Sequence, residues 1–131
     1  MRSKPQMTLE DAYRIADAAR NAAAKRNGSA GTIAIVDSGG HLLYLERPDR
    51  QSPNSVEIAT RKARTAAFRE RPSSALEERV KEQPGWLMFP NGLAMSGGVP
   101  LFHDGECVGG IGVSGIATHD EVVAKAGAEA L

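Results

Sequence analysis

The side chains that could do chemistry in this sequence are few and far apart. Three histidines, His41, His103 and His119, lie in different segments, and none has a second His or Cys at zinc-ligand spacing. This pattern argues against a preformed zinc site. His41 and His103 fall in expected hairpin turns, where a solvated imidazole is the usual outcome. His119 follows the cap of the last expected helix, beside glycine-rich residues 112–115, so its imidazole could face a ligand held there.

Cys107 is the sole cysteine, so an internal disulfide is excluded. It lies between Glu106 and Val108 in an expected strand, where a buried thiol is the common outcome. Nucleophilic catalysis by this thiol would need a neighbouring base, and the sequence gives no sign of one.

Two glycine-rich segments, 96–100 and 109–115, would let another backbone or a flat ligand approach closely. Residues 110–115 have G-x-G-x-x-G spacing, but no βαβ unit surrounds them, so we reject a dinucleotide site. An anion-holding rim is plausible, because Ser114 and a helix N-terminus lie nearby. A turn needed for packing alone is the alternative. Lys62, at the edge of the buried stripe of its helix, could meet a carboxylate or extend to solvent.

The elements that position these residues follow from periodicity and turn chemistry. We expect a first helix from Leu9 to Asn27–Gly28, capped by Thr8, and a second that begins at a Ser55 cap and is stopped by Arg71–Pro72. A third helix should begin at a capping box, Ser74–Glu77, and end at about Gln83. A last helix should follow a capping box at Thr118–Glu121. We expect five strands near 32–36, 41–46, 92–96, 99–103 and 106–113. The links between the last strands are too short for parallel crossovers, so the fold class is α+β with a mainly antiparallel sheet.

Composition narrows the class of protein. The 131 residues predict a single domain over 1–131. Sixteen Lys plus Arg balance sixteen Asp plus Glu, which argues against nucleic acid as a partner. The apolar stretches are too short to span a membrane, and no apolar region of a signal peptide follows Met1–Gln6. A cytoplasmic location is therefore expected.

A series of short motifs, most of them rich in Gly or Ala, runs along the chain. They are Asp37–Leu42, Ile58–Ala59, Lys62–Ala63, Thr65–Phe68, Arg71–Ser73, Gly97–Leu101, Asp104–Gly105, Val108–Gly115, Asp120–Glu121, and Ala124 with Ala126–Gly127. With these motifs the chain resembles the GlcG/HbpS family, small proteins often described as haem-binding or haem-degrading and similar to the C-terminal domain of PduO-type cobalamin adenosyltransferases. The resemblance covers Thr8 to Leu131, and residues 97–115 are its most specific part.

The resemblance implies a three-layer α-β-α arrangement around a five-stranded antiparallel sheet, profilin-like or roadblock-like in appearance. It implies a homo-oligomer, either a dimer or a larger ring. It also implies haem as the cofactor.

Three functions stay in competition. In the first, haem is bound, with its degradation as a further option; His119, His41 or His103 is the iron donor and Trp86, Met88 and Phe89 form an apolar wall. In the second, the chain acts on a small carboxylated metabolite as an isomerase, a hydrolase or an accessory protein. The third is a non-catalytic oligomeric module in which the glycine-rich strands allow close subunit packing. The sequence leaves open whether the chain is an enzyme.

The candidate site residues follow from these alternatives. The anion seat would consist of Lys62, Arg47, Ser114 and the N-terminus of the last helix, where Gly115 leaves room for approach. Proton transfer would fall to His119 or Asp120. The expected ligand-binding set also includes Gly97, Gly98, Trp86 and Phe89.

Overall fold

The computed structural model describes residues 1–27 and 31–131 of the chain. Its helices are α1 (Leu9–Asn27), α2 (Ser55–Arg69), α3 (Ser73–Glu82), α4 (Asp120–Ala128) and two short 3-10 helices, η1 (Pro84–Met88) and η2 (Ala117–His119). Its strands are β1 (Thr32–Asp37), β2 (Leu42–Glu46), β3 (Gly98–His103) and β4 (Glu106–Ser114). They form one sheet in the order β2-β1-β4-β3, and every neighbouring pair is antiparallel. The predicted α+β class and antiparallel pairing are confirmed.

The predicted five-stranded sheet is wrong, because in the described part of the chain the sheet has four strands. Residues 92–96 form no strand. Their backbone groups bond to side chains of the helices instead. The N–H of Leu93 donates to Oγ1 of Thr65 at 2.8 Å, and the carbonyl of Met95 accepts from Oγ of Ser73 at 2.6 Å. A segment whose backbone is held by α2 and α3 is not free to pair with β3.

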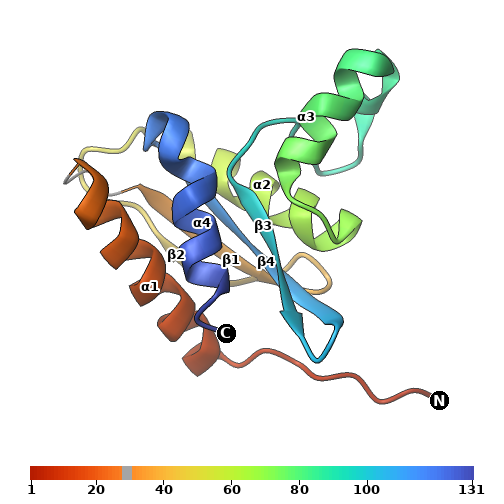
Figure 1. Ribbon diagram of the computed structural model, residues 1–131, viewed down its shortest axis with the longest axis horizontal. Helices are drawn as coiled ribbons and strands as arrows, with labels where there is room; N and C mark the ends of the chain where they lie inside the picture. The colour runs from red at the N-terminus through yellow and green to blue at the C-terminus, as the bar shows by residue number, and fades with distance from the viewer. Residues whose placement is uncertain (28–30) are drawn as a thin grey trace.

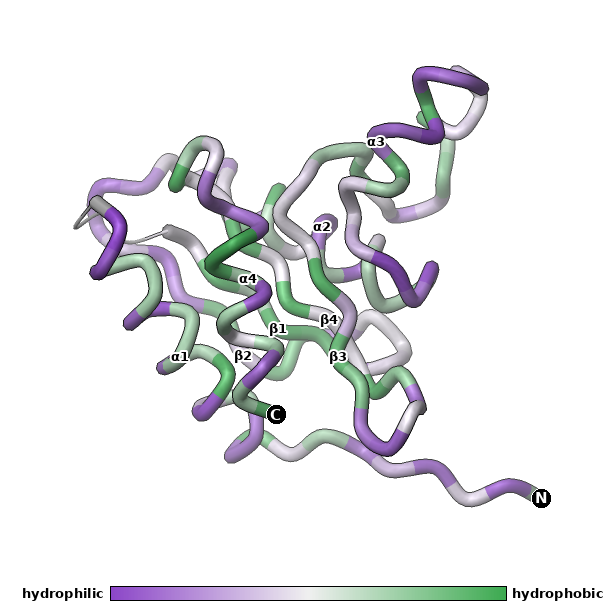
Figure 2. Tube along the Cα trace, in the orientation of Figure 1, coloured by the Kyte–Doolittle hydropathy of each residue, from purple (hydrophilic) through white to green (hydrophobic). Residues whose placement is uncertain are grey.

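The sheet is covered on both faces, as Figure 1 shows. Helices α1 and α4 pack on one face, and α2 packs on the other. Helix α3 and η1 project from one end of this arrangement, next to α2. In Figure 2 the sheet is coloured mostly hydrophobic, whereas α3 is mostly hydrophilic. The main core lies between the sheet and the α1–α4 pair, and includes Ile15, Ile33, Ile35, Leu101 and Val123.

Strand β4 alternates glycine with branched residues. Ile111 and Val113 belong to the main core, whereas Gly110 and Gly112 face α2. A Cβ on Gly112 would lie 1.9 Å from the carbonyl oxygen of Ala59 in α2. Only glycine therefore lets the α2 backbone approach the sheet this closely.

The start of α1 follows the sequence prediction. Oγ1 of Thr8 accepts a hydrogen bond from the N–H of Asp11 at 3.1 Å, and the N–H of Thr8 donates to the Asp11 carboxylate at 2.8 Å. These reciprocal bonds form a capping box, and the bond from the Thr8 backbone, first among its causes, lowers the pKa of Asp11. The predicted stop at Gly28 lies outside the described residues.

The other predicted caps are wrong, and the hydroxyls of Ser55 and Ser74 bond to other groups. Asn54, not Ser55, occupies the N-cap of α2, and Oγ of Ser55 bonds to the carbonyl of Ser52 at 2.6 Å. Helix α3 begins one residue before Ser74, whose hydroxyl donates to Glu121 of α4 at 2.6 Å. Helix α4 begins only at Asp120, with no side-chain cap.

Within the described residues, no helix has the length and apolar character required to cross a membrane.

Candidate functional site

The predicted anion seat contains a buried ion pair. Lys62 of α2 is only 2% exposed, and its Nζ lies 3.1 Å from Oδ2 of Asp120 at the start of α4. The same ammonium donates to the carbonyl of Val113 at 3.1 Å. The other Asp120 oxygen accepts from the N–H of Ile116 at 2.8 Å. Both charges are thus matched within the chain, and the pair links α2, on one face of the sheet, to the start of α4, on the other.

Two predicted ligand-binding glycines make room for this pair. Gly97 has a φ of +126°, and a Cβ there would lie 2.9 Å from Nζ of Lys62 and 2.7 Å from the carbonyl oxygen of Val113. A Cβ on Gly98 would lie 2.1 Å from the backbone oxygen of Lys62. In this structure both glycines allow the backbone to pass beside α2.

The other predicted residues at this end of α4 are placed together. Ser114 ends β4 and is buried, and Gly115 follows it with a φ of +102°. The side-chain amide of Gln51 donates to the carbonyl of Gly115 at 3.3 Å. His119 is half-buried and precedes Asp120 directly. The ring of His119 makes no hydrogen bond or ion pair with the described residues, so it is the polar group of this region that is open to a ligand.

Three predicted residues lie elsewhere. Arg47 is exposed in the loop after β2 and forms no ion pair in the described part of the chain. Trp86 and Phe89 line a hollow between the end of α2, α3 and η1. The structure therefore does not bring Trp86 and Phe89 into the group formed by Lys62, Ser114 and Asp120.

The hollow beside Trp86 contains residues that sequence reasoning missed. Arg69, Arg71 and Arg79 line it together with Trp86. The guanidinium carbons of Arg69 and Arg79 lie 5.5 Å and 5.2 Å from the centre of the Trp86 ring, within cation–π range. The sequence signal was the helix–break–helix pattern at Arg71–Pro72, which turns the chain back so that α3 lies beside the end of α2.

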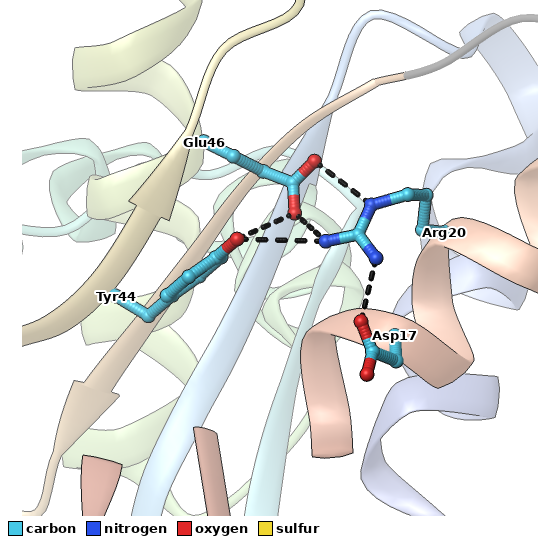
Figure 3. A network of polar contacts seen from close by, with 4 residues as sticks. All are labelled: Asp17, Arg20, Tyr44 and Glu46. Carbon is cyan, nitrogen blue, oxygen red and sulfur yellow. Dashed lines mark hydrogen bonds and ion pairs between the residues drawn. The ribbon is translucent and has the colours of Figure 1, made fainter. Parts of the chain in front are cut away.

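A second polar network ties the sheet edge to α1 and is drawn in Figure 3. The Arg20 guanidinium bonds to both oxygens of Glu46, to Asp17 and to the hydroxyl of Tyr44. The hydrogen bond to Glu46, followed by that to Asp17, raises the pKa of Arg20. Burial, followed by its hydrogen bond to Glu46, raises the pKa of Tyr44. Because each member has partners inside the network, its role is to hold β2 against α1.

The remaining reactive side chains are isolated. Cys107 is free and buried, and burial raises the pKa of its thiol. His41 is exposed, and His103 is exposed beside Asp104, with 3.3 Å between Nε2 and Oδ2. Among the residues that the structure describes, no three His, Cys, Asp or Glu side chains are grouped to hold a metal ion.

The structure is thus a small α+β fold with helices on both faces of the sheet, a glycine-lined β4 and a buried ion pair at the start of α4. Residues 7–129 match the model of the family described as haem degrading protein HbpS-like, and the chain belongs to this family. It is 38% identical over 115 residues to protein GlcG of Escherichia coli strain K12, which covers 87% of this chain and 85% of that protein.

Two solved structures support the same fold. A double mutant of HbpS from Streptomyces reticuli has a TM-score of 0.90 and 37% identity, covering 100% of this chain and 90% of that one. A PduOC:haem complex has a TM-score of 0.83 and 25% identity, covering 97% of this chain and 96% of that one.

Proposed function

We propose that this chain binds haem. The observation that carries the proposal is the match of residues 7–129 to a family described as haem-degrading. It is supported by the shared fold of a PduOC:haem complex. The HbpS double mutant from Streptomyces reticuli, at 37% identity, also shares the fold of this chain.

The donor chemistry of the chain fits this group. Haem requires an axial ligand for iron and apolar surface for the macrocycle. His119 offers an imidazole with no partner among the described residues, and Val122, one helical turn further on, is 40% exposed. Bound haem would supply the redox chemistry of its iron. The protein would hold the imidazole in the orientation that iron ligation requires. We therefore assign the iron donor to His119 ahead of His41, which directly precedes β2, and His103, which ends β3, because both are exposed.

Asp120 contributes to this assignment indirectly. Its carboxylate is held by the ammonium of Lys62 and the N–H of Ile116, so the first turn of α4 has a fixed position. Because His119 directly precedes Asp120, the position of its backbone is fixed as well. We propose a positioning role for Asp120 in place of the proton transfer expected from sequence.

Haemin titration tests the proposal. The purified protein should give a Soret shift that saturates at a fixed ratio of haem to chain, and His119→Ala should abolish the shift or move its maximum. His103→Ala is the matched control, because it removes an exposed imidazole from the other end of the sheet. A parent protein without a saturable shift would contradict haem binding. A normal shift in His119→Ala would contradict only the assignment of the ligand.

Two finer expectations are tested with the same material. If the chain degrades haem, the Soret band of the complex should decay under a reductant and oxygen faster than that of free haem. If the chain is a homo-oligomer, light scattering should return a multiple of 13.9 kDa. The exposed apolar residues Leu87 (65%) and Met88 (83%) on η1 support an oligomer, because burial against another subunit would remove them from water.

A further inference from the structure

The hollow between the end of α2, α3 and η1 has the chemistry of a ligand site. Its volume is about 570 Å³, and its walls include three arginines, two glutamates, Ala75, Trp86 and Phe89. Arg69 comes from the last turn of α2, Arg71 from the link that follows, and Arg79 from α3. Three segments of the chain therefore each contribute a positive charge to the hollow.

These arginines have no acidic partner. None of the three forms an ion pair with any residue in the ranges 1–27 and 31–131. Nη1 of Arg69 is buried and has no hydrogen-bond acceptor in the structure. Of the two glutamates on the wall, Glu78 pairs with Lys81 on the outer surface of α3, at 2.9 Å. Glu82, the second glutamate of the wall, forms no ion pair with the described arginines. The guanidinium groups of Arg69 and Arg79 contact the Trp86 ring, but the three arginines have no carboxylate partner within the described ranges.

Such an arrangement is unfavourable until an anion occupies it. A buried N–H without an acceptor loses its hydration without compensation. The pKa of Arg69 is lowered, first by burial and then by the charges of Arg71 and Arg79, which agrees with crowding of like charges. A carboxylate would relieve both effects, because its two oxygens accept the paired N–H groups of a guanidinium.

The other walls indicate what the anion is attached to. Ala75, Trp86 and Phe89 supply apolar and aromatic surface next to the arginines. Inorganic phosphate would leave this surface in water, whereas a planar apolar body would cover it.

We propose that this hollow binds a carboxylate carried on a planar, apolar body, such as an aromatic acid. The proposal does not depend on haem binding at His119, because neither His119 nor any residue of α4 lines the hollow. It assigns the anion seat to Arg69, Arg71 and Arg79, since the cation expected in that role, Lys62, is paired with Asp120.

Trp86 makes the proposal directly measurable, because it is the only tryptophan in the sequence. Titration of the parent protein with benzoate should give a saturable change in tryptophan fluorescence. Arg69→Gln and Arg71→Gln should each weaken benzoate binding about tenfold or more, as expected for loss of a charge-assisted hydrogen bond. Arg50→Gln is the matched control, since it removes an exposed arginine from the loop between β2 and α2, and it should bind benzoate like the parent. Benzyl alcohol, which lacks the charge, should bind far more weakly.

Several outcomes would overturn the proposal. These are no saturable change in the parent protein, equal binding of benzoate and benzyl alcohol, or equal loss of affinity in the Arg50→Gln control. Inorganic phosphate that binds as tightly as benzoate would overturn the apolar part of the assignment. Circular dichroism shows whether each variant is folded. If Arg69→Gln does not fold, Arg71→Gln carries the test, because Arg71 is exposed.

Discussion

Replacing Lys62 by Met should cost the protein much of its stability. The substitution keeps the length and apolar stem of the side chain and removes its ammonium. It leaves the carboxylate of Asp120, 12% exposed, without its only ion-pair partner among the described residues. It also leaves the carbonyl of Val113 without this donor.

The magnitude follows from the geometry of the pair. At 3.1 Å between Nζ and Oδ2 and an effective dielectric constant of about 20, the Coulomb attraction is about 5 kcal/mol. Desolvation offsets much of this in the intact pair, but removing one partner leaves that cost with the other charge. We therefore expect Lys62→Met to lower the free energy of unfolding by about 3–5 kcal/mol.

Urea unfolding followed by circular dichroism measures this loss. The double variant Lys62→Met with Asp120→Asn should be more stable than the sum of the single losses predicts, by about 1–3 kcal/mol. The control is Lys81→Met, because Lys81 pairs with Glu78 at a surface where both side chains are more than two-thirds exposed. Its loss should stay below about 1 kcal/mol. A Lys62→Met variant as stable as Lys81→Met would refute the structural role of the buried pair.

Three further outcomes are expected. Gly112→Ala should lower the free energy of unfolding by about 3 kcal/mol or prevent folding, since its Cβ would meet the Ala59 carbonyl at 1.9 Å. The control Gly85→Ala, which has open space around it, should change the free energy of unfolding by less than about 0.5 kcal/mol in the same urea assay. Cys107 should react slowly with a disulfide reagent in the folded protein and fast in urea, because burial raises its pKa and blocks access; fast native reaction would contradict this. The raised pKa of Tyr44 should contribute stability that is full below the ordinary value of 10.0 and is lost as pH rises through the folded value; unfolding at several alkaline pH values, compared with Tyr44→Phe, measures it.

Sequence reasoning predicted the elements that depend on local patterns. The strands around Ile35 and Ile111 follow from β-branched runs, and the Thr8 cap follows from a hydroxyl placed directly before acidic first-turn residues. The prediction of a fifth strand was wrong, because backbone groups of residues 92–96 bond to Thr65 in α2 and Ser73 in α3. These partners are distant in the sequence, so no local pattern could predict them.

The candidate site was predictable only in part. Gly97 and Gly98 were recognised as positions of close approach, but sequence did not show that the approaching group is Lys62. The partner of Lys62 is 58 residues away in the chain, so no spacing rule relates the two. Arg69 and Arg79 were not among the predicted site residues, because their shared hollow exists only once the chain reverses between α2 and α3.

The glycines of the sheet and the buried ion pair depend on one another. Gly112 and Gly98 bring the α2 backbone against the sheet, and that approach buries Lys62. A buried ammonium requires a counter-charge, and Asp120 at the start of α4 supplies it. The pair therefore fixes where α4 begins, and with it the position of His119. A lower haem affinity in Lys62→Met would then report displacement of His119 rather than loss of a ligand contact, because Lys62 is 2% exposed and its ammonium bonds to Val113 and Asp120.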